Sequence, residues 1–151
     1  MKKNKKIGLI SSPGGHFVEV LELLEAFEGY SYFFMTYKET ATENREKTYY
    51  IINFIKSPFS FIAGVLKILF IFFRERPTVL LSTGAEIAIP TFYIGKFLFR
   101  TKLIYMECSA QVYQPSKTGR WVYPITDLFL VQWEPLLSHY GSRAKYVGGL
   151  I

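Results

Sequence analysis

The segment at residues 11–16, Ser-Ser-Pro-Gly-Gly-His, combines serine hydroxyls, a flexible backbone and an imidazole. An apolar run precedes it and an amphipathic stretch that begins near Phe17 follows it, which predicts a strand, a loop and a helix. Gly14 and Gly15 can adopt a positive φ and let a ligand approach the backbone, while a helix start offers unpaired N–H groups to an anion. His16 at that start can donate to a phosphate or accept a proton from a nucleophile. We therefore expect the chemistry of the protein at this loop.

A plainer interpretation of the loop stays open, because two glycines after a strand often form only a tight turn and a lone histidine is often structural. Neither the dinucleotide-binding fingerprint nor the P-loop pattern is matched. Two other segments follow predicted strands and are expected at the same edge of a sheet, namely Ser82-Thr83-Gly84 and Glu107–Gln111. Glu107 is a second candidate for orienting or deprotonating a hydroxyl, with a solvated carboxylate or a helix cap as the alternative. The candidate catalytic residues are His16 and Glu107, and the candidate substrate- or phosphate-binding residues are Ser11, Ser12, Gly14, Gly15, Ser82, Thr83, Gly84, Ser109 and Gln111.

The composition indicates one domain over residues 1–151 with unusually many aromatic side chains. Half of the residues are apolar, 18% are aromatic, and the formal net charge is +6. Such a chain is long enough to bury its own core, and part of its aromatic surface is expected to meet a membrane or a partner protein. The positive charge suits anionic lipid or phosphate-bearing ligands. No dense stripe of lysine and arginine occurs, so we expect no nucleic-acid partner.

The cysteine and histidine content argues against disulfides, metals and cofactors. Cys108 is the single cysteine, which fits a reducing compartment, and we interpret it as a structural thiol. No paired cysteine and histidine spacing suggests a metal site, and no cofactor is expected. The basic start of the chain runs directly into a strand without an apolar core or a cleavage site, so we expect no signal peptide.

Alternating elements along the chain predict an α/β fold. Strands are expected at Lys6–Ser11, Tyr30–Thr36, Thr48–Asn53, Thr78–Ser82, Lys102–Glu107 and Asp127–Gln132. Besides the first helix, helices are expected at Ser57–Phe73, Glu86–Phe99, Thr118–Tyr123 and Glu134–Tyr140, and a polar surface loop at Tyr37–Lys47. Several strands are almost continuously apolar, which is typical of strands covered on both faces. The pattern predicts a Rossmann-like, doubly wound parallel sheet with ligands beyond the carboxyl ends of its strands.

The helix expected at Ser57–Phe73 is the most apolar segment of the chain. It is shorter than the roughly 20 apolar residues that a bilayer span needs, and it carries Lys67. It is either buried in the core or lies in a membrane interface with basic residues at headgroup level. The second interpretation is favoured because an apolar stretch followed by Arg100 repeats this pattern in the next helix. The residues expected at the membrane are Phe61, Leu66, Lys67, Phe70, Phe73, Arg74, Phe97 and Arg100.

Three groups of motifs together resemble a known family. They are Ser-Ser-Pro-Gly-Gly-His at 11–16 with Glu19, then Arg-Pro-Thr-Val-Leu-Leu-Ser-Thr-Gly at 76–84 with Pro90, and the segment 105–119 continuing to 127–133 and 146–149. This ordered set covers nearly the whole chain and is more specific than any one motif. The chain resembles the asparagine-linked-glycosylation-14-like family, especially the bacterial capsule and exopolysaccharide glycosyltransferase subunits of the PssD/CpsF type.

The resemblance implies the N-terminal, Rossmann-like half of a two-chain GT-B glycosyltransferase that is inactive alone. In this family the chain associates with the membrane and takes the lipid-linked acceptor, and a small partner subunit holds the UDP-sugar in the shared cleft. The expected acceptor is an undecaprenyl-diphosphate-linked saccharide at the cytoplasmic face of the cell membrane, and the expected reaction is an inverting transfer of GlcNAc, Gal or Glc. We expect no N-terminal membrane helix of the kind that some members carry, and we expect the domain to end just after 146–149, where a one-chain enzyme would continue into its second domain.

The sequence departs from the pattern of the family at one position, and the resemblance does not say which surface contacts the partner subunit. The family often has arginine where this chain has Gln111, so a phosphate contact would have to come from Arg120 or Lys117. Trp121, Trp133 and Tyr140 are expected to be exposed and available to the partner. Two other functions remain open, a non-catalytic anchor that enhances a catalytic partner, and a soluble nucleotide-binding protein.

Overall fold

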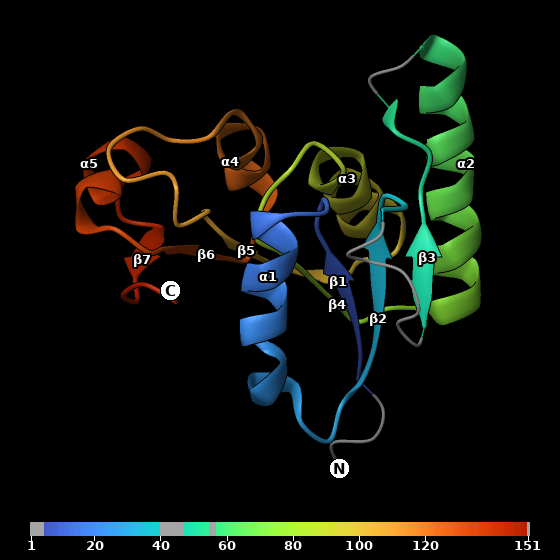
Figure 1. Cartoon of the computed structure of the whole chain (residues 1–151), viewed down its shortest axis with the longest axis horizontal. Coiled ribbons are helices and arrows are strands. Elements are labelled where there is room, and N and C mark those ends of the chain that lie inside the picture. Colours follow the sequence, from blue (N-terminus) through green and yellow to red (C-terminus); the bar gives the residue numbers. More distant parts are fainter. Residues whose placement is uncertain (1–4, 40–46, 55–56, 151) are drawn as a thin grey trace.

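A computed structural model describes residues 5–39, 47–54 and 57–150 and contains one sheet of seven parallel strands in the order β3-β2-β1-β4-β5-β6-β7 (Figure 1). The strands are β1 (Lys6–Ile10), β2 (Ser31–Thr36), β3 (Thr48–Tyr50), β4 (Val79–Ser82), β5 (Lys102–Met106), β6 (Leu128–Val131) and β7 (Ala144–Tyr146). The helices are α1 (Gly15–Glu22), α2 (Pro58–Glu75), α3 (Ala88–Leu98), α4 (Lys117–Val122) and α5 (Leu137–Tyr140), with 3₁₀ turns at Leu24–Phe27, Tyr123–Ile125 and Glu134–Leu136. The predicted Rossmann-like, doubly wound fold is confirmed.

Helices cover both faces of the sheet, which explains the continuous apolar strands. Ile7 and Leu9 of β1 lie in one core cluster with Phe17 and Val20 of α1. Ile10 lies in the other cluster, which includes residues of α2 and α3. Successive side chains of a strand point to opposite faces, so a strand with a helix on each side needs apolar residues at both sets of positions.

The predicted boundaries differ from the structure at several elements. The sequence predicted six strands, and the seventh, β7, was missed because it has three residues, of which only Ala144 is buried. The first helix begins at Gly15 rather than near Phe17, and the last predicted helix is a 3₁₀ turn followed by the single turn of α5. Of the predicted loop 37–47, residues 40–46 lie outside the described residues.

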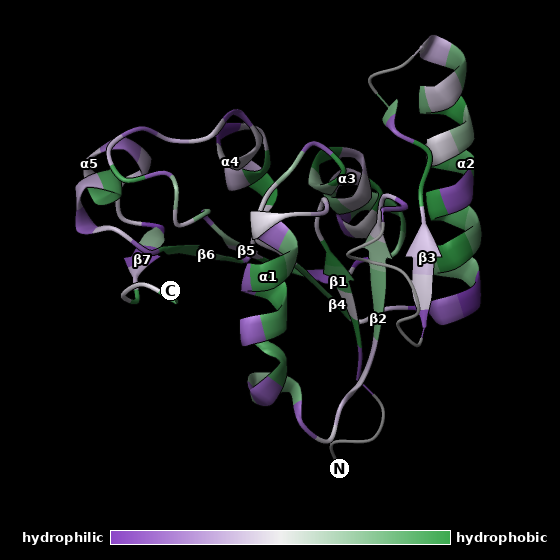
Figure 2. Cartoon of the chain, in the orientation of Figure 1, coloured by the Kyte–Doolittle hydropathy of each residue, from purple (hydrophilic) through white to green (hydrophobic). Residues whose placement is uncertain are grey.

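Helix α2 lies at the edge of the sheet and buries one side only. The Ser57 hydroxyl accepts a hydrogen bond from Ser60 N at 3.1 Å, Pro58 takes the first helical position, and Arg76 ends the helix with a left-handed φ of 48°. Its buried residues are Gly64, Ile68, Ile71 and Phe72. The opposite side exposes a row of large apolar side chains, Phe59, Ile62, Leu66, Phe70 and Phe73. Figure 2 shows hydrophobic residues along most of this outer helix.

The interpretation of α2 as a helix buried all round is therefore wrong. All eight residues expected at a membrane are exposed, including Lys67, Arg74, Phe97 and Arg100. Within the described ranges, no helix has both the length and the apolar character needed to cross a bilayer.

Candidate active site at the strand switch point

The site lies where the order of the strands reverses. β1 pairs with β2 on one side and with β4 on the other, and Ile10 of β1 stands beside Ser82 of β4. The chain therefore leaves these two neighbouring strands toward opposite parts of the sheet and opens a crevice at their carboxyl ends. The loop 11–14 after β1 and the turn 83–87 after β4 lie together at this edge of the sheet, as the sequence predicted.

His16 is held by the turn after β4. Its Nδ1 lies 3.1 Å from the carbonyl oxygen of Thr83, and the Thr83 hydroxyl donates to the His16 carbonyl at 2.7 Å. Because a carbonyl only accepts, Nδ1 carries the hydrogen in this contact and Nε2 keeps its lone pair in the neutral ring. Gly84 has a φ of 139° and lies under the imidazole, where an added Cβ would come within 2.5 Å of Cε1. The fold thus presents Nε2 as a proton acceptor on a half-buried side chain.

The start of α1 faces the same crevice with an open backbone. Gly14 has a φ of 89°, Gly14 and Gly15 are both exposed, and no side chain caps the helix. The first N–H groups of a helix have no partner within the helix, so an uncapped and exposed start suits an anion. Ser12 is half-buried beside this start, whereas Ser11 is almost fully buried.

Ser82 and Thr83 hold the turn with their side chains, so only the backbone of residues 82–84 remains a candidate for binding substrate. Both side chains are fully buried. The Ser82 hydroxyl donates to the Gly84 carbonyl at 3.0 Å and accepts from Gly84 N at 3.2 Å, while the Thr83 hydroxyl is bonded to His16. Their part in the site is to fix Gly84 and His16.

The buried carboxylate of Glu19 lies close to His16 and contacts the segments that follow β5 and β6. Its Oε1 accepts from Ser109 N at 2.7 Å and from Gln132 Nε2 at 3.2 Å, and its Oε2 lies 3.9 Å from His16 Nδ1. Glu19 is only 1% exposed, and Oε2 has no hydrogen-bond partner within the described part of the chain. No role was predicted for Glu19, although its spacing of three residues from His16 places it on the same side of α1.

Glu107 is buried at the carboxyl end of β5 and accepts several hydrogen bonds. Ser116 N donates to Oε2 at 3.2 Å, Cys108 N donates to Oε1 at 3.3 Å, and the Tyr140 hydroxyl donates to Oε2. Its side chain has no exposed surface, so the solvated alternative is wrong. Through these hydrogen bonds Glu107 anchors the segment that follows β5.

Cys108 lies between the two carboxylates. Burial and the charges of Glu19 and Glu107 raise the pKa of its thiol, although a hydrogen bond from Ala110 N opposes the rise, so the thiol stays protonated near neutral pH, as expected for a structural cysteine. The sequence spacing suggested no metal site, yet the fold brings ligand atoms of His16, Glu19 and Cys108 within 4.8 Å of one another. Spacing along the chain does not reveal this grouping, because the three residues come from two separate segments.

The predicted partner residues behave differently from one another. Trp121 is 63% exposed and Trp133 is 36% exposed, with the Trp133 indole N–H donating to the Ser109 carbonyl at 2.6 Å. Tyr140 is 7% exposed, so the prediction that it is an exposed partner contact is wrong. Its ring packs against Phe129 because α5 folds back over β6.

Gln111, a predicted phosphate-binding residue, is half-buried in a turn in which its N–H donates to the Cys108 carbonyl.

The fold and this crevice define a Rossmann-like domain of the kind found in GT-B enzymes. The structure superposes on Acinetobacter baumannii MurG with a TM-score of 0.77 at 15% identity, covering 96% of this chain and 46% of MurG. It also superposes on S. aureus MnaA, in a co-structure with UDP, with a TM-score of 0.71 at 14% identity, covering 97% of this chain and 44% of that one. At these identities the likeness establishes the fold alone.

The family follows from the sequence comparisons. Residues 50–150 match the family described as "Oligosaccharide biosynthesis protein Alg14 like", and the chain belongs to this family. The UDP-N-acetylglucosamine transferase subunit ALG14 of Candida albicans is 37% identical over 108 residues, covering 68% of this chain and 47% of the relative. The same subunit of Debaryomyces hansenii is 33% identical over 129 residues, covering 75% and 55%. The chain thus spans about half the length of these relatives.

Proposed function

We propose that this chain is the acceptor-side, N-terminal half of a two-chain, inverting GT-B glycosyltransferase that is inactive alone. A small partner subunit would hold a UDP-sugar (GlcNAc, Gal or Glc), and this chain would present a lipid-diphosphate-linked saccharide. The observation that carries the proposal is His16 in the switch-point crevice, with Nδ1 on the Thr83 carbonyl and Nε2 free to accept a proton. The names of the relatives, which are UDP-N-acetylglucosamine transferase subunits, support the same class of reaction.

The proposed reaction uses this arrangement in the following way. The acceptor hydroxyl oxygen attacks the anomeric carbon of the sugar and loses its proton to Nε2 of His16. The bond from that carbon to the β-phosphate oxygen breaks, and UDP leaves with the electron pair. Glu19 and Glu107 are positioning residues, since the first lies beneath His16 and binds the Ser109 backbone, and the second binds the Ser116 backbone. The uncapped start of α1 supplies N–H groups to a diphosphate.

The exposed apolar row on α2 supports contact with a membrane surface. Phe59, Ile62, Leu66, Phe70 and Phe73 follow one another at helical spacing and are 56% to 83% exposed. Lys67, Arg74 and Arg100 lie next to this row, where they match the charge of anionic headgroups. We propose peripheral association of the α2 face with the cytoplasmic side of the cell membrane. The resemblance to capsule and exopolysaccharide proteins further favours an undecaprenyl-diphosphate carrier.

The transfer reaction is tested by co-expressing the chain with its small glycosyltransferase-like partner. Membranes are assayed for transfer from labelled UDP-sugars to a lipid-diphosphate-linked saccharide, with each chain alone as a control. The proposal expects transfer only from the pair. His16→Gln is expected to lower turnover by about a hundredfold or more, the usual contribution of a general base, while leaving the complex intact. Lys145→Gln, an exposed change on β7, is the matched control and keeps full activity.

A second function, a non-catalytic anchor for an active partner, is favoured by the exposed face of α2 and by Trp121. The same assay separates the two functions, because an anchor leaves turnover unchanged in His16→Gln and the partner then retains activity alone.

Contact of the α2 face with a membrane is measured by flotation with vesicles containing anionic lipid. Leu66→Ser with Phe70→Ser should weaken binding at least about tenfold, since each side chain is worth roughly 1.5–3 kcal/mol when fully buried. Val18→Ser, an exposed apolar change on α1, is the control.

A further inference from the structure

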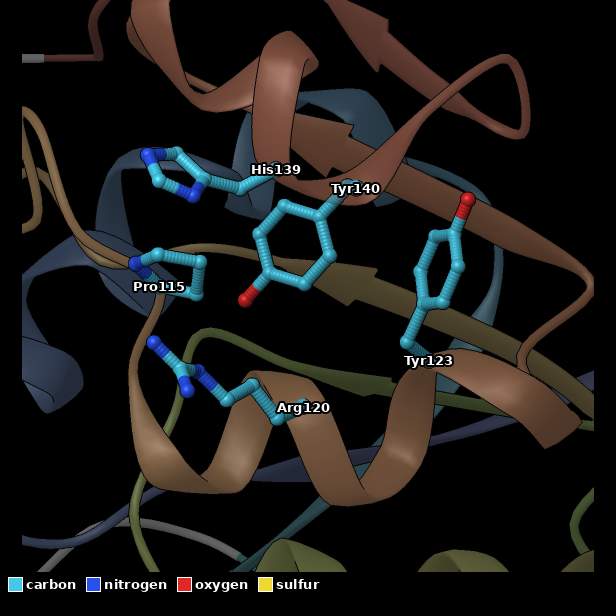
Figure 3. A pocket seen from close by; sticks show the side chains of 5 residues that line it. All are labelled: Pro115, Arg120, Tyr123, His139 and Tyr140. Carbon is cyan, nitrogen blue, oxygen red and sulfur yellow. The ribbon is translucent and has the colours of Figure 1, made fainter.

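A pocket with a volume of about 300 Å³ lies between α4 and α5, apart from the His16 crevice (Figure 3). Pro115, Arg120, Tyr123, His139 and Tyr140 line it. The figure shows the Arg120 guanidinium and the His139 imidazole on either side of Pro115, on the side toward which the Tyr140 hydroxyl points. Two nitrogen donors from different helices thus converge on one small space.

Arg120 gives the pocket lining a positive charge, and the Glu107 carboxylate lies behind the Tyr140 hydroxyl. None of the five lining residues is acidic, and Arg120 and His139 are both exposed. Neither side chain has a hydrogen-bond or ion-pair partner in the ranges that the structure describes. The guanidinium offers planar, bidentate donors, and the imidazole adds a third donor, a set that suits phosphate oxygens.

The walls of the pocket are fixed rather than adaptable. The Ser116 hydroxyl caps α4 by accepting from Gly119 N at 2.8 Å, and Ser116 N donates to Glu107. On the other wall, the Tyr140 hydroxyl donates to the same carboxylate. The Tyr140 ring packs 5.1 Å from Tyr123 and 4.4 Å from Phe129, measured between ring centroids. Glu107 therefore anchors both sides of the pocket, so the segments that carry Arg120 and His139 are positioned before a ligand arrives, while the two side chains themselves stay exposed.

We propose that this pocket is a diphosphate subsite in which Arg120 and His139 bind the phosphate oxygens. The inference rests on the proposed function, in which donor and acceptor both carry a diphosphate. The volume is at the lower end of ligand pockets, so the pocket takes a diphosphate group with little of the attached molecule. Tyr140, which lines the pocket, donates to Glu107 just after β5, so a diphosphate bound here lies on the same sheet edge as His16.

The probe is inorganic pyrophosphate, titrated into the ¹⁵N-labelled full chain at constant ionic strength. We expect saturable shifts of the Arg120 and His139 side-chain resonances. Arg120→Gln should weaken pyrophosphate binding at least about tenfold and His139→Gln several-fold, because charge-assisted hydrogen bonds are the stronger ones. Both side chains are exposed and unpartnered in the described residues, so both variants should fold, which circular dichroism checks. Lys145→Gln removes one positive charge away from the pocket and is the matched control.

UDP and farnesyl diphosphate, titrated in parallel, tell which substrate supplies the diphosphate. Tighter binding of UDP than of farnesyl diphosphate, lost in Arg120→Gln, assigns the subsite to the donor, and the reverse order assigns it to the acceptor. Unchanged pyrophosphate binding in Arg120→Gln overturns the proposal, and so does an equal loss in Lys145→Gln. This binding measurement needs neither the partner nor turnover, so its failure is distinct from a failure of the proposed transfer reaction.

Discussion

The contact between Tyr140 and Glu107 gives a sharp test of how the site is held. Tyr140→Phe removes only the hydroxyl that donates to Glu107 and keeps the ring against Tyr123 and Phe129. Glu107 has no exposed surface, and its remaining donors, Ser116 N and Cys108 N, lie at 3.2 Å and 3.3 Å. Neither of these longer contacts replaces the lost hydroxyl.

The expected loss is about 1.5–3 kcal/mol of unfolding free energy, the value of a hydrogen bond to a charged group. For a domain of this size that loss lowers Tm by about 3–12 °C. Urea denaturation followed by circular dichroism measures the change, with an unaltered slope if only the folded contact is lost. Tyr113→Phe, at a side chain that is 70% exposed, is the control and should stay within about 0.5 kcal/mol of the wild type.

A double-mutant cycle assigns the loss to this pair. In a Glu107→Gln background the charge is absent, so Tyr140→Phe should cost clearly less than in the wild-type chain. A cost of Tyr140→Phe below about 0.5 kcal/mol, or an equal cost in both backgrounds, would refute the reasoning that Tyr140 supports the buried carboxylate.

Three further changes follow from the structure. Burial and the charge of Glu107 raise the pKa of Tyr140, so the folded chain holds this proton above the unfolded value of 10.0, and stability falls as the pH rises past 10.0. Urea midpoints should therefore fall less steeply in Tyr140→Phe over that range. Burial raises the pKa of Asp127, but hydrogen bonds from Lys96 and Leu103 N outweigh it and lower the pKa below 3.8. The stabilisation is thus present above pH 3.8 and lost as the pH falls further, and acid titration of Asp127→Asn should show a shallower loss. Gly84→Ala places a Cβ within 2.5 Å of His16 Cε1 and should lower transfer by the partnered enzyme about a hundredfold. Gly29→Ala, at a glycine whose φ of 81° is also positive but whose added Cβ would meet nothing within 4 Å, should keep that activity.

Local patterns in the sequence were enough for the fold class and for the position of the crevice. Apolar runs predicted six of the seven strands, because a strand covered on both faces needs apolar residues at every position. The loop with the sequence Ser-Ser-Pro-Gly-Gly-His was predicted to lie at the site because its two glycines stand directly before the start of a helix. The shorter strand β7 carries too little apolar pattern to be recognised, since only one of its three residues is buried.

The contacts within the site connect segments that lie far apart in the sequence, and no local sequence pattern predicts such contacts. Glu19 lies 113 residues from Gln132 along the chain, yet the two side chains hydrogen-bond at 3.2 Å because α1 and the end of β6 meet at one sheet edge. The burial of Ser82, Thr83 and Tyr140 depends in the same way on how loops fold over that edge. Sequence alone determined the elements and the chemistry available at residue 16, since these depend on neighbours along the chain. Only the tertiary structure decided which carboxylates are buried, what holds His16, and that Arg120 and His139 share a pocket, because packing between distant segments sets those contacts.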